Sequence, residues 1–110
     1  MKLPNGDKAY IPKNKLPDYL LSVNHPIGAT KAVFFRGLDF NESNQASLER
    51  ELLDIARNTE IVESEITLHG HKYVLEGILH SPLGLPRLIR TVWIVEPNRT
   101  EPRFVTAYPP

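Results

Sequence analysis

The chain has 110 residues, no cysteine and a formal net charge of zero; 41% of its residues are hydrophobic and 24% are charged. This length and composition fit one globular domain, residues 1–110, and exclude a disordered tail, a disulfide framework and a thiolate metal site. No secretory leader follows Met1 and no apolar run approaches the length of a membrane span, so we expect a cytoplasmic protein without membrane contact.

Charge is spread unevenly along the chain. Residues 1–40 contain six Lys or Arg and three acids, residues 41–65 contain two and seven, and residues 66–110 contain five and three. Overall neutrality argues against the strong basic field of a non-specific nucleic-acid binder. The two basic segments, residues 1–40 and 66–110, are nevertheless able to form a local basic cleft, with the acidic segment 41–65 facing away from it.

The first forty residues predict a short strand and two short helices. Lys8–Ile11 forms the strand, and Lys15–Leu21 forms a helix with a proline in its first turn, where the missing N–H costs little. The Asn24-His-Pro sequence ends this helix, because a residue before proline is kept out of the α region. Ala29–Arg36 forms the second helix, and Gly37 stops it.

A third, longer helix and four strands follow. The helix spans roughly Gln45–Asn58, and its apolar residues fall on one stripe. From residue 60 the hydrophobic period changes to two, which predicts four strands: Ile61–Leu68, His71–His80, Arg87–Val95 and Arg103–Tyr108. Short turns between them favour an antiparallel meander. We therefore predict an α+β fold, in which an N-terminal short strand and about three helices pack on a four-stranded antiparallel sheet.

Two residues near the second helix are candidates for chemistry. His25 lies in a turn, where an imidazole titrates near neutral pH and can act as a general acid or base. Lys31 lies where the second helix begins, so its cation can join that terminus in holding an anion. Taken singly, each residue is also compatible with a plain turn histidine and a surface lysine. His69 and His71 flank a hairpin but supply only half of a tetrahedral shell, so we predict no metal site.

The last two strands carry polar residues on an otherwise apolar background. Thr106 and Tyr108 are two residues apart and therefore share one face of the sheet. If the pairing with the preceding strand keeps even parity, Arg90 shares that face; with odd parity, Thr91 and Trp93 do. A guanidinium, a hydroxyl and a phenol on one face would make a phosphate-binding surface. A solvated sheet face carries similar residues.

Four short motifs together resemble an uncharacterised family of small bacterial proteins. They are Lys15–Leu21, Asn24–Phe34, Arg90–Val95 and Arg103–Tyr108, and they span nearly the whole chain. That family in turn resembles the barnase/EndoU/colicin/RelE-like (BECR) ribonuclease superfamily. The superfamily has helices followed by a four-stranded antiparallel sheet, and its sites draw basic residues from the helices and polar residues from the sheet.

The resemblance implies a metal-independent endoribonuclease of toxin type, without a cofactor, that has RNA as substrate and a small antitoxin or immunity protein as partner. In such cleavage a base takes the proton of the ribose 2′-hydroxyl, an acid protonates the leaving 5′-oxygen, and cations stabilise the phosphorane. His25 would have the acid–base role and Lys31 would balance the developing charge. Arg90, Thr106 and Tyr108 would orient the phosphate. The residues expected to contact substrate are Lys15, Thr91 (as a substitute under odd parity) and Trp93 (by stacking, unless it lies in the core).

Two functional interpretations remain open at this stage. The first is a small RNA-cleaving enzyme of toxin type. The second is a non-catalytic interaction module that binds protein or nucleic acid, either as a degenerate relative or as a toxin–antitoxin component. The enzyme interpretation requires His25, Lys31 and the polar face of the last strands to converge on one cleft.

Overall fold

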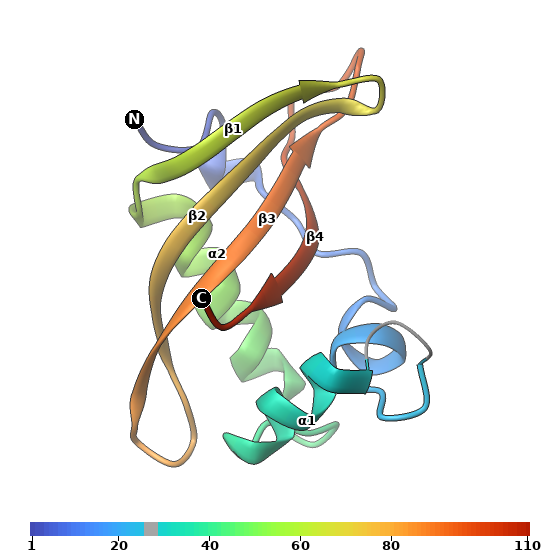
Figure 1. The fold of residues 1–110 in the computed structure, drawn as a ribbon, viewed down its shortest axis with the longest axis vertical. Helices are drawn as coiled ribbons and strands as arrows, with labels where there is room; N and C mark the ends of the chain where they lie inside the picture. Colours follow the sequence, from blue (N-terminus) through green and yellow to red (C-terminus); the bar gives the residue numbers. More distant parts are fainter. Residues whose placement is uncertain (26–28) are drawn as a thin grey trace.

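The computed structural model describes residues 1–25 and 29–110 of the chain. Its elements in chain order are η1 (Gly6–Lys8), η2 (Leu16–Leu20), α1 (Ala29–Gly37), α2 (Gln45–Asn58), β1 (Ile61–Thr67), β2 (Gly70–His80), β3 (Pro86–Val95) and β4 (Arg103–Tyr108). Figure 1 shows α2 crossing behind the sheet, while η2 and α1 lie beside the β4 end of it. Within the described ranges, no helix has the length and apolar character needed to cross a membrane.

The four strands form one antiparallel meander. Their order in the sheet is β1-β2-β3-β4, and each neighbouring pair is antiparallel. The predicted strand limits hold to within one residue: β1 ends at Thr67, β2 begins at Gly70 and β3 begins at Pro86. The α+β fold class predicted from the change in hydrophobic period is therefore confirmed.

The N-terminal region differs from its prediction. Lys8 belongs to a 3₁₀ turn, and the predicted strand is reduced to a single parallel bridge between Tyr10 and Arg103. The Tyr10 N–H donates to the Pro102 carbonyl at 3.0 Å, and the Tyr10 carbonyl accepts from Phe104 at 3.0 Å. A proline at position 12 follows, and its missing N–H prevents the ladder from continuing.

The short helix η2 has π geometry. The Leu20 N–H donates to the Lys15 carbonyl at 2.9 Å, and the Leu21 N–H donates to the Leu16 carbonyl at 2.8 Å. These bonds span five residues, so the turn is wider than that of an α-helix. Leu16 and Leu20 are buried, whereas Tyr19 lies at the margin of the core, half-buried.

Helix α2 covers one face of the sheet. Its predicted apolar stripe is buried, at Leu48, Leu52, Ile55 and Ala56. The helix approaches β2 closely at Gly77, where an added Cβ would lie 3.0 Å from the side chains of Ile55 and Thr59. The opposite face of the sheet, which we call the open face, has no helix over it (Figure 1).

The register of β3 and β4 resolves the parity left open by the sequence. Arg90 pairs with Tyr108, so the two side chains share the open face. Thr91 and Trp93 point the other way and are fully buried, at 0% exposure each. The Trp93 Nε1–H donates to Thr91 Oγ1 at 2.8 Å. Neither side chain is therefore placed to contact substrate: the parity is not the odd one under which Thr91 was a candidate, and Trp93 lies in the core.

The Thr91 hydroxyl is the buried acceptor for the indole N–H, so its removal should lower stability. We expect Thr91→Val to reduce the free energy of unfolding by about 1–3 kcal/mol, since it leaves the Trp93 N–H without a partner at nearly constant volume. Thr91→Ser keeps the hydroxyl and serves as the matched control. Urea unfolding followed by tryptophan fluorescence measures both, and a Thr91→Val variant as stable as the wild type would contradict this assignment.

Candidate functional site

The phenol oxygen of Tyr19 joins three segments that are far apart in the sequence. It lies 3.0 Å from the Oγ1 of Thr106 in β4 and accepts a hydrogen bond from the Lys31 Nζ of α1, also at 3.0 Å. All three side chains are half-buried. We call Lys15, Tyr19, His25, Lys31 and Thr106 the Tyr19 cluster.

Two ammonium groups lie against the ring of Tyr19. The Lys15 Nζ is 4.4 Å from the ring centroid and the Lys31 Nζ is 5.6 Å from it. Lys15 precedes Tyr19 by four residues, so one turn of η2 brings its ammonium over the ring, where the ring's negative face attracts it. Among the described residues, neither lysine forms an ion pair with a carboxylate. The cluster therefore presents positive charge that no acid within the described part of the chain neutralises by direct contact.

Electrostatics within the cluster favour an anion. Burial lowers the pKa of Lys15, and the neighbouring charges of Arg103 and Lys31 lower it further, against the opposing effect of Tyr19. Arg103 differs from the two lysines, because its Nε donates to Glu96 at 3.0 Å. A bound anion would oppose the mutual repulsion of these cations.

The pKa of Tyr19 is shifted by the same contacts. Burial acts to raise it, but the hydrogen bonds with Thr106 and Lys31 and the charges of Lys31 and Lys15 outweigh burial. The pKa of Tyr19 therefore lies below that of an ordinary tyrosine. A phenol with such a pKa gives up its proton more readily, which suits a group that takes part in proton transfer.

His25 reaches the cluster through the ring of Tyr19. The two rings meet edge to face, with centroids 5.0 Å apart and planes at 89°. The His25 carbonyl accepts a hydrogen bond from the Ala29 N–H at 3.1 Å, which ties the turn to the first residue of α1. The intervening residues 26–28 lie outside the described residues. His25, Lys31 and Thr106 thus converge, with Tyr19 at their centre.

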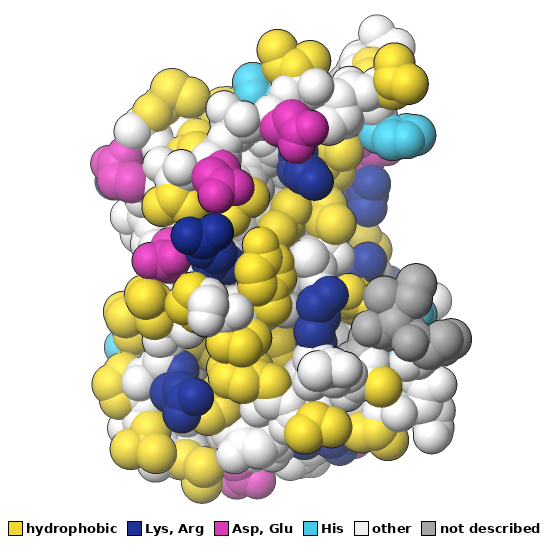
Figure 2. All heavy atoms as spheres, in the orientation of Figure 1, with side chains coloured by type: hydrophobic (Ala, Val, Ile, Leu, Met, Phe, Trp, Pro, Cys, Tyr) yellow, Lys and Arg dark blue, Asp and Glu magenta, His cyan; other side chains and the backbone are white. Residues whose placement is uncertain are grey.

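Arg90 and Tyr108 occupy the open face of the sheet, and Arg90 is held by acids there. The Arg90 Nε donates to Glu76 at 3.0 Å, and its Nη1 lies 3.4 Å from Glu63. Figure 2 shows this face, with Lys and Arg side chains standing among hydrophobic ones and acidic side chains mostly toward β1. Tyr108 borders a depression of about 380 Å³ that Lys31 also lines. Tyr108 is therefore next to the cluster, whereas Arg90 is engaged elsewhere.

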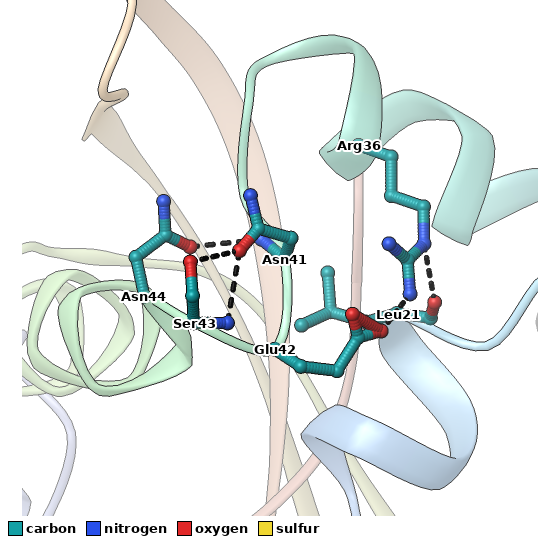
Figure 3. A network of polar contacts seen from close by, with 6 residues as sticks. All are labelled: Leu21, Arg36, Asn41, Glu42, Ser43 and Asn44. Atoms are coloured by element: carbon teal, nitrogen blue, oxygen red, sulfur yellow. Dashed lines mark hydrogen bonds and ion pairs between the residues drawn. The ribbon is translucent and has the colours of Figure 1, made fainter.

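Arg36 fixes α1 relative to η2. Its Nε donates to the Leu21 carbonyl at 2.8 Å, just after η2 ends, and its Nη2 pairs with the Glu42 carboxylate (Figure 3). Hydrogen bonds within the following turn, drawn in Figure 3, join Asn41, Ser43 and Asn44. The helices that carry the phenol and the Lys31 ammonium are thus held together at the end of α1 away from the cluster.

Two residues near the site were not among the sequence candidates. Tyr19 lies within the Lys15–Leu21 motif and Arg103 begins the Arg103–Tyr108 motif, but neither was singled out as a site residue, although the charge of Arg103 lowers the pKa of Lys15. The available signal was the four-residue spacing of Lys15 and Tyr19, which puts an ammonium beside a phenol on one helical turn. Within the described ranges, no group of three or more His, Asp or Glu side chains is placed to hold a metal ion.

Comparison with known proteins gives a family and a solved structure of similar fold. The family model described as Domain of unknown function (DUF6883) matches residues 2–110. A chain in the solved "Contact-dependent growth inhibition toxin - immunity protein complex from Klebsiella pneumoniae 342" superposes with a TM-score of 0.73 and 18% identity, covering 94% of this chain and 95% of that one. At this identity the likeness shows a shared fold. No curated protein matches the chain.

The contacts of Tyr19 predict how its ionisation responds to mutation. We expect Lys31→Met to raise the pKa of Tyr19, because the variant removes both a hydrogen bond to the phenol oxygen and a nearby positive charge. Ultraviolet titration of phenolate absorbance measures the shift, and Tyr19→Phe identifies the Tyr19 transition among the four tyrosines. Lys8→Met, which removes an exposed lysine of η1, is the control and should leave the pKa of Tyr19 unchanged. An equal Tyr19 pKa in wild type and Lys31→Met would refute the contact.

Proposed function

The chain belongs to the DUF6883 family, and we propose that it is a metal-independent endoribonuclease of bacterial toxin type. One observation carries the proposal. The half-buried phenol of Tyr19 lies 3.0 Å from Lys31 Nζ and from Thr106 Oγ1, with a second ammonium over its ring and His25 at its edge. This arrangement combines an anion site with two groups able to transfer protons.

A phosphodiester is the anion that best fits this combination. Half-buried lysines without acid partners gain from an anionic ligand, since each charge is costly to remove from water without an opposite charge. RNA also brings its own nucleophile, the 2′-hydroxyl, so cleavage needs proton transfer and charge stabilisation. The Tyr19 cluster contains candidates for both tasks.

The cleavage step assigns roles to four members of the cluster. The 2′-oxygen attacks phosphorus and loses its proton to a base, the bond from phosphorus to the 5′-oxygen breaks, and an acid protonates that oxygen. The products are a 2′,3′-cyclic phosphate and a 5′-hydroxyl. His25 and Tyr19 share the two proton transfers, Lys31 opposes the charge on the phosphorane, and Thr106 orients a phosphate oxygen.

The remaining candidates act at the margins of this site. Lys15 binds the same phosphate or the next one, since its ammonium lies over the ring of Tyr19. Tyr108 contacts the substrate from the depression that Lys31 lines. Arg90 binds a phosphate only if it first releases the carboxylates of Glu76 and Glu63. These two ion pairs make it the least favoured of the residues predicted from the sequence.

A toxin-type ribonuclease requires a partner that blocks it in the producing cell. The fold likeness to a chain of a toxin–immunity protein complex supports a partner of this kind for the present chain. An inhibitor that presents carboxylates to Lys15 and Lys31 would compete with RNA for the same charges.

A non-catalytic interaction module is the second candidate, and one feature favours it. The edge strand β1 is largely exposed, and the apolar side chains Ile66 and Leu68 at its end are 83% and 96% exposed. The N-terminal segment bridges only the start of this edge, at Glu60 and Ile61. An exposed edge strand is able to accept a strand from another chain. In that case the Tyr19 cluster would bind an anion without catalysing its cleavage.

The ribonuclease proposal is tested with total RNA in excess EDTA. We expect the wild type to cleave it and His25→Ala, Tyr19→Phe and Lys31→Met each to lose activity by about 100-fold or more, as is usual when an acid–base or charge-stabilising group is removed. Product ends are analysed for the 2′,3′-cyclic phosphate by gel mobility after phosphatase treatment.

Lys8→Met, which removes an exposed lysine away from the cluster, is the matched control and should cleave like the wild type. Intact RNA with folded wild-type protein would favour the interaction module. Cleavage abolished by EDTA would defeat the metal-free mechanism, and cleavage unaffected by all three cluster variants would place the site elsewhere.

A further inference from the structure

A depression of about 380 Å³ adjoins the Tyr19 cluster. It is lined by Thr30, Lys31, Phe34, Tyr108 and Pro109. Its volume falls within the range of about 300–1,000 Å³ that is usual for small-molecule sites. Lys31 is shared between the depression and the cluster, because its Nζ also donates to the phenol of Tyr19.

Two aromatic side chains line this depression, and each lies on the same helix or strand as a member of the cluster. Phe34 follows Lys31 by three residues in α1, so the ring and the ammonium share one helical face. Tyr108 follows Thr106 by two residues in β4, so the phenol and the hydroxyl share one sheet face. The helix and the strand that bring Lys31 and Thr106 to Tyr19 therefore also bring these two rings to the same place.

The ring of Phe34 is held in position and has a cation near it. It packs edge to face on the fully buried Phe35, with centroids 5.0 Å apart and planes at 81°. The Arg87 guanidinium of β3 lies 5.7 Å from the Phe34 centroid. A planar group that stacked on this ring would therefore have a positive charge close by, which suits a base with a phosphate attached.

We propose that the depression is a nucleobase subsite, which holds the base next to the phosphate bound at the Tyr19 cluster, with Phe34 as its principal stacking residue. The proposal rests on the proposed function and deepens it, since it names a residue that distinguishes a nucleotide from other anions. Stacking of one base on an aromatic side chain changes affinity by roughly 5- to 150-fold and tolerates any base. The subsite therefore selects nucleotides over simple phosphates and leaves base preference to other contacts.

Separate probes distinguish the subsite from the phosphate site. The wild-type chain is titrated with inorganic phosphate, ribose 5-phosphate, adenosine 3′-monophosphate and uridine 3′-monophosphate, and binding is followed by NMR of aromatic rings and lysine ammonium groups. We expect both nucleotides to bind at least about fivefold more tightly than ribose 5-phosphate, consistent with one stacked base. The ring signals of Phe34 and Tyr108 should shift with the nucleotides alone.

Variants at Phe34 make the test specific. Phe34→Leu should remove the advantage of nucleotides while leaving the affinity for inorganic phosphate unchanged, and Phe34→Tyr, which keeps a ring, should retain the advantage. Equal affinities for nucleotides and ribose 5-phosphate, with Lys31 signals still moving, would overturn the subsite and leave the phosphate site standing. If no probe moves the Lys31 or Tyr19 signals, both the subsite and the proposed function fail.

Discussion

The hydrogen bonds of the Tyr19 phenol are the interactions on which the rest of the site depends. Through them η2 and α1 contact β4, although Tyr19 and Thr106 are 87 residues apart in the chain. The β4 side of this contact is held by the sheet and by the bridge to Tyr10, and the α1 side is held by Arg36. The side chains of the cluster are thus held in place by the helices and the sheet of the fold.

Much of this fold could be predicted from local patterns. Helix α2 and strand β4 have the predicted limits, because a long apolar stripe and a clean period of two leave few alternatives. The N-terminal strand was not predicted correctly, since a single bridge at Tyr10 has no periodicity of its own. The register of β3 against β4 could not be predicted from either strand alone, because the register shift between Val92 and Trp93 depends on both strands.

The candidate site could be predicted only in part, because local sequence does not show which distant residues meet. Local sequence indicated the chemistry that His25 and Lys31 can perform, but their meeting with Thr106 depends on tertiary packing. Tyr19 was overlooked because aromatic residues beside buried leucines usually complete a core, and here the ring does so while its hydroxyl faces the cations. Arg90 was indicated by its type, yet its cross-strand pairing with Glu76 gives it a carboxylate partner.

We propose that RNA phosphate binds at the Tyr19 cluster and not at Arg90 and Lys72, two other cations of the open face. NMR titration with a short RNA whose 2′-hydroxyl is removed at every position tests it directly, because binding is then observed without cleavage. We expect the signals of the Tyr19 ring and of the Lys31 and Lys15 ammonium groups to shift together, while the ammonium of Lys72, which shares a sheet face with Arg90, is unaffected. Shifts confined to Lys72 and Arg90, with a silent Tyr19, would contradict the proposal.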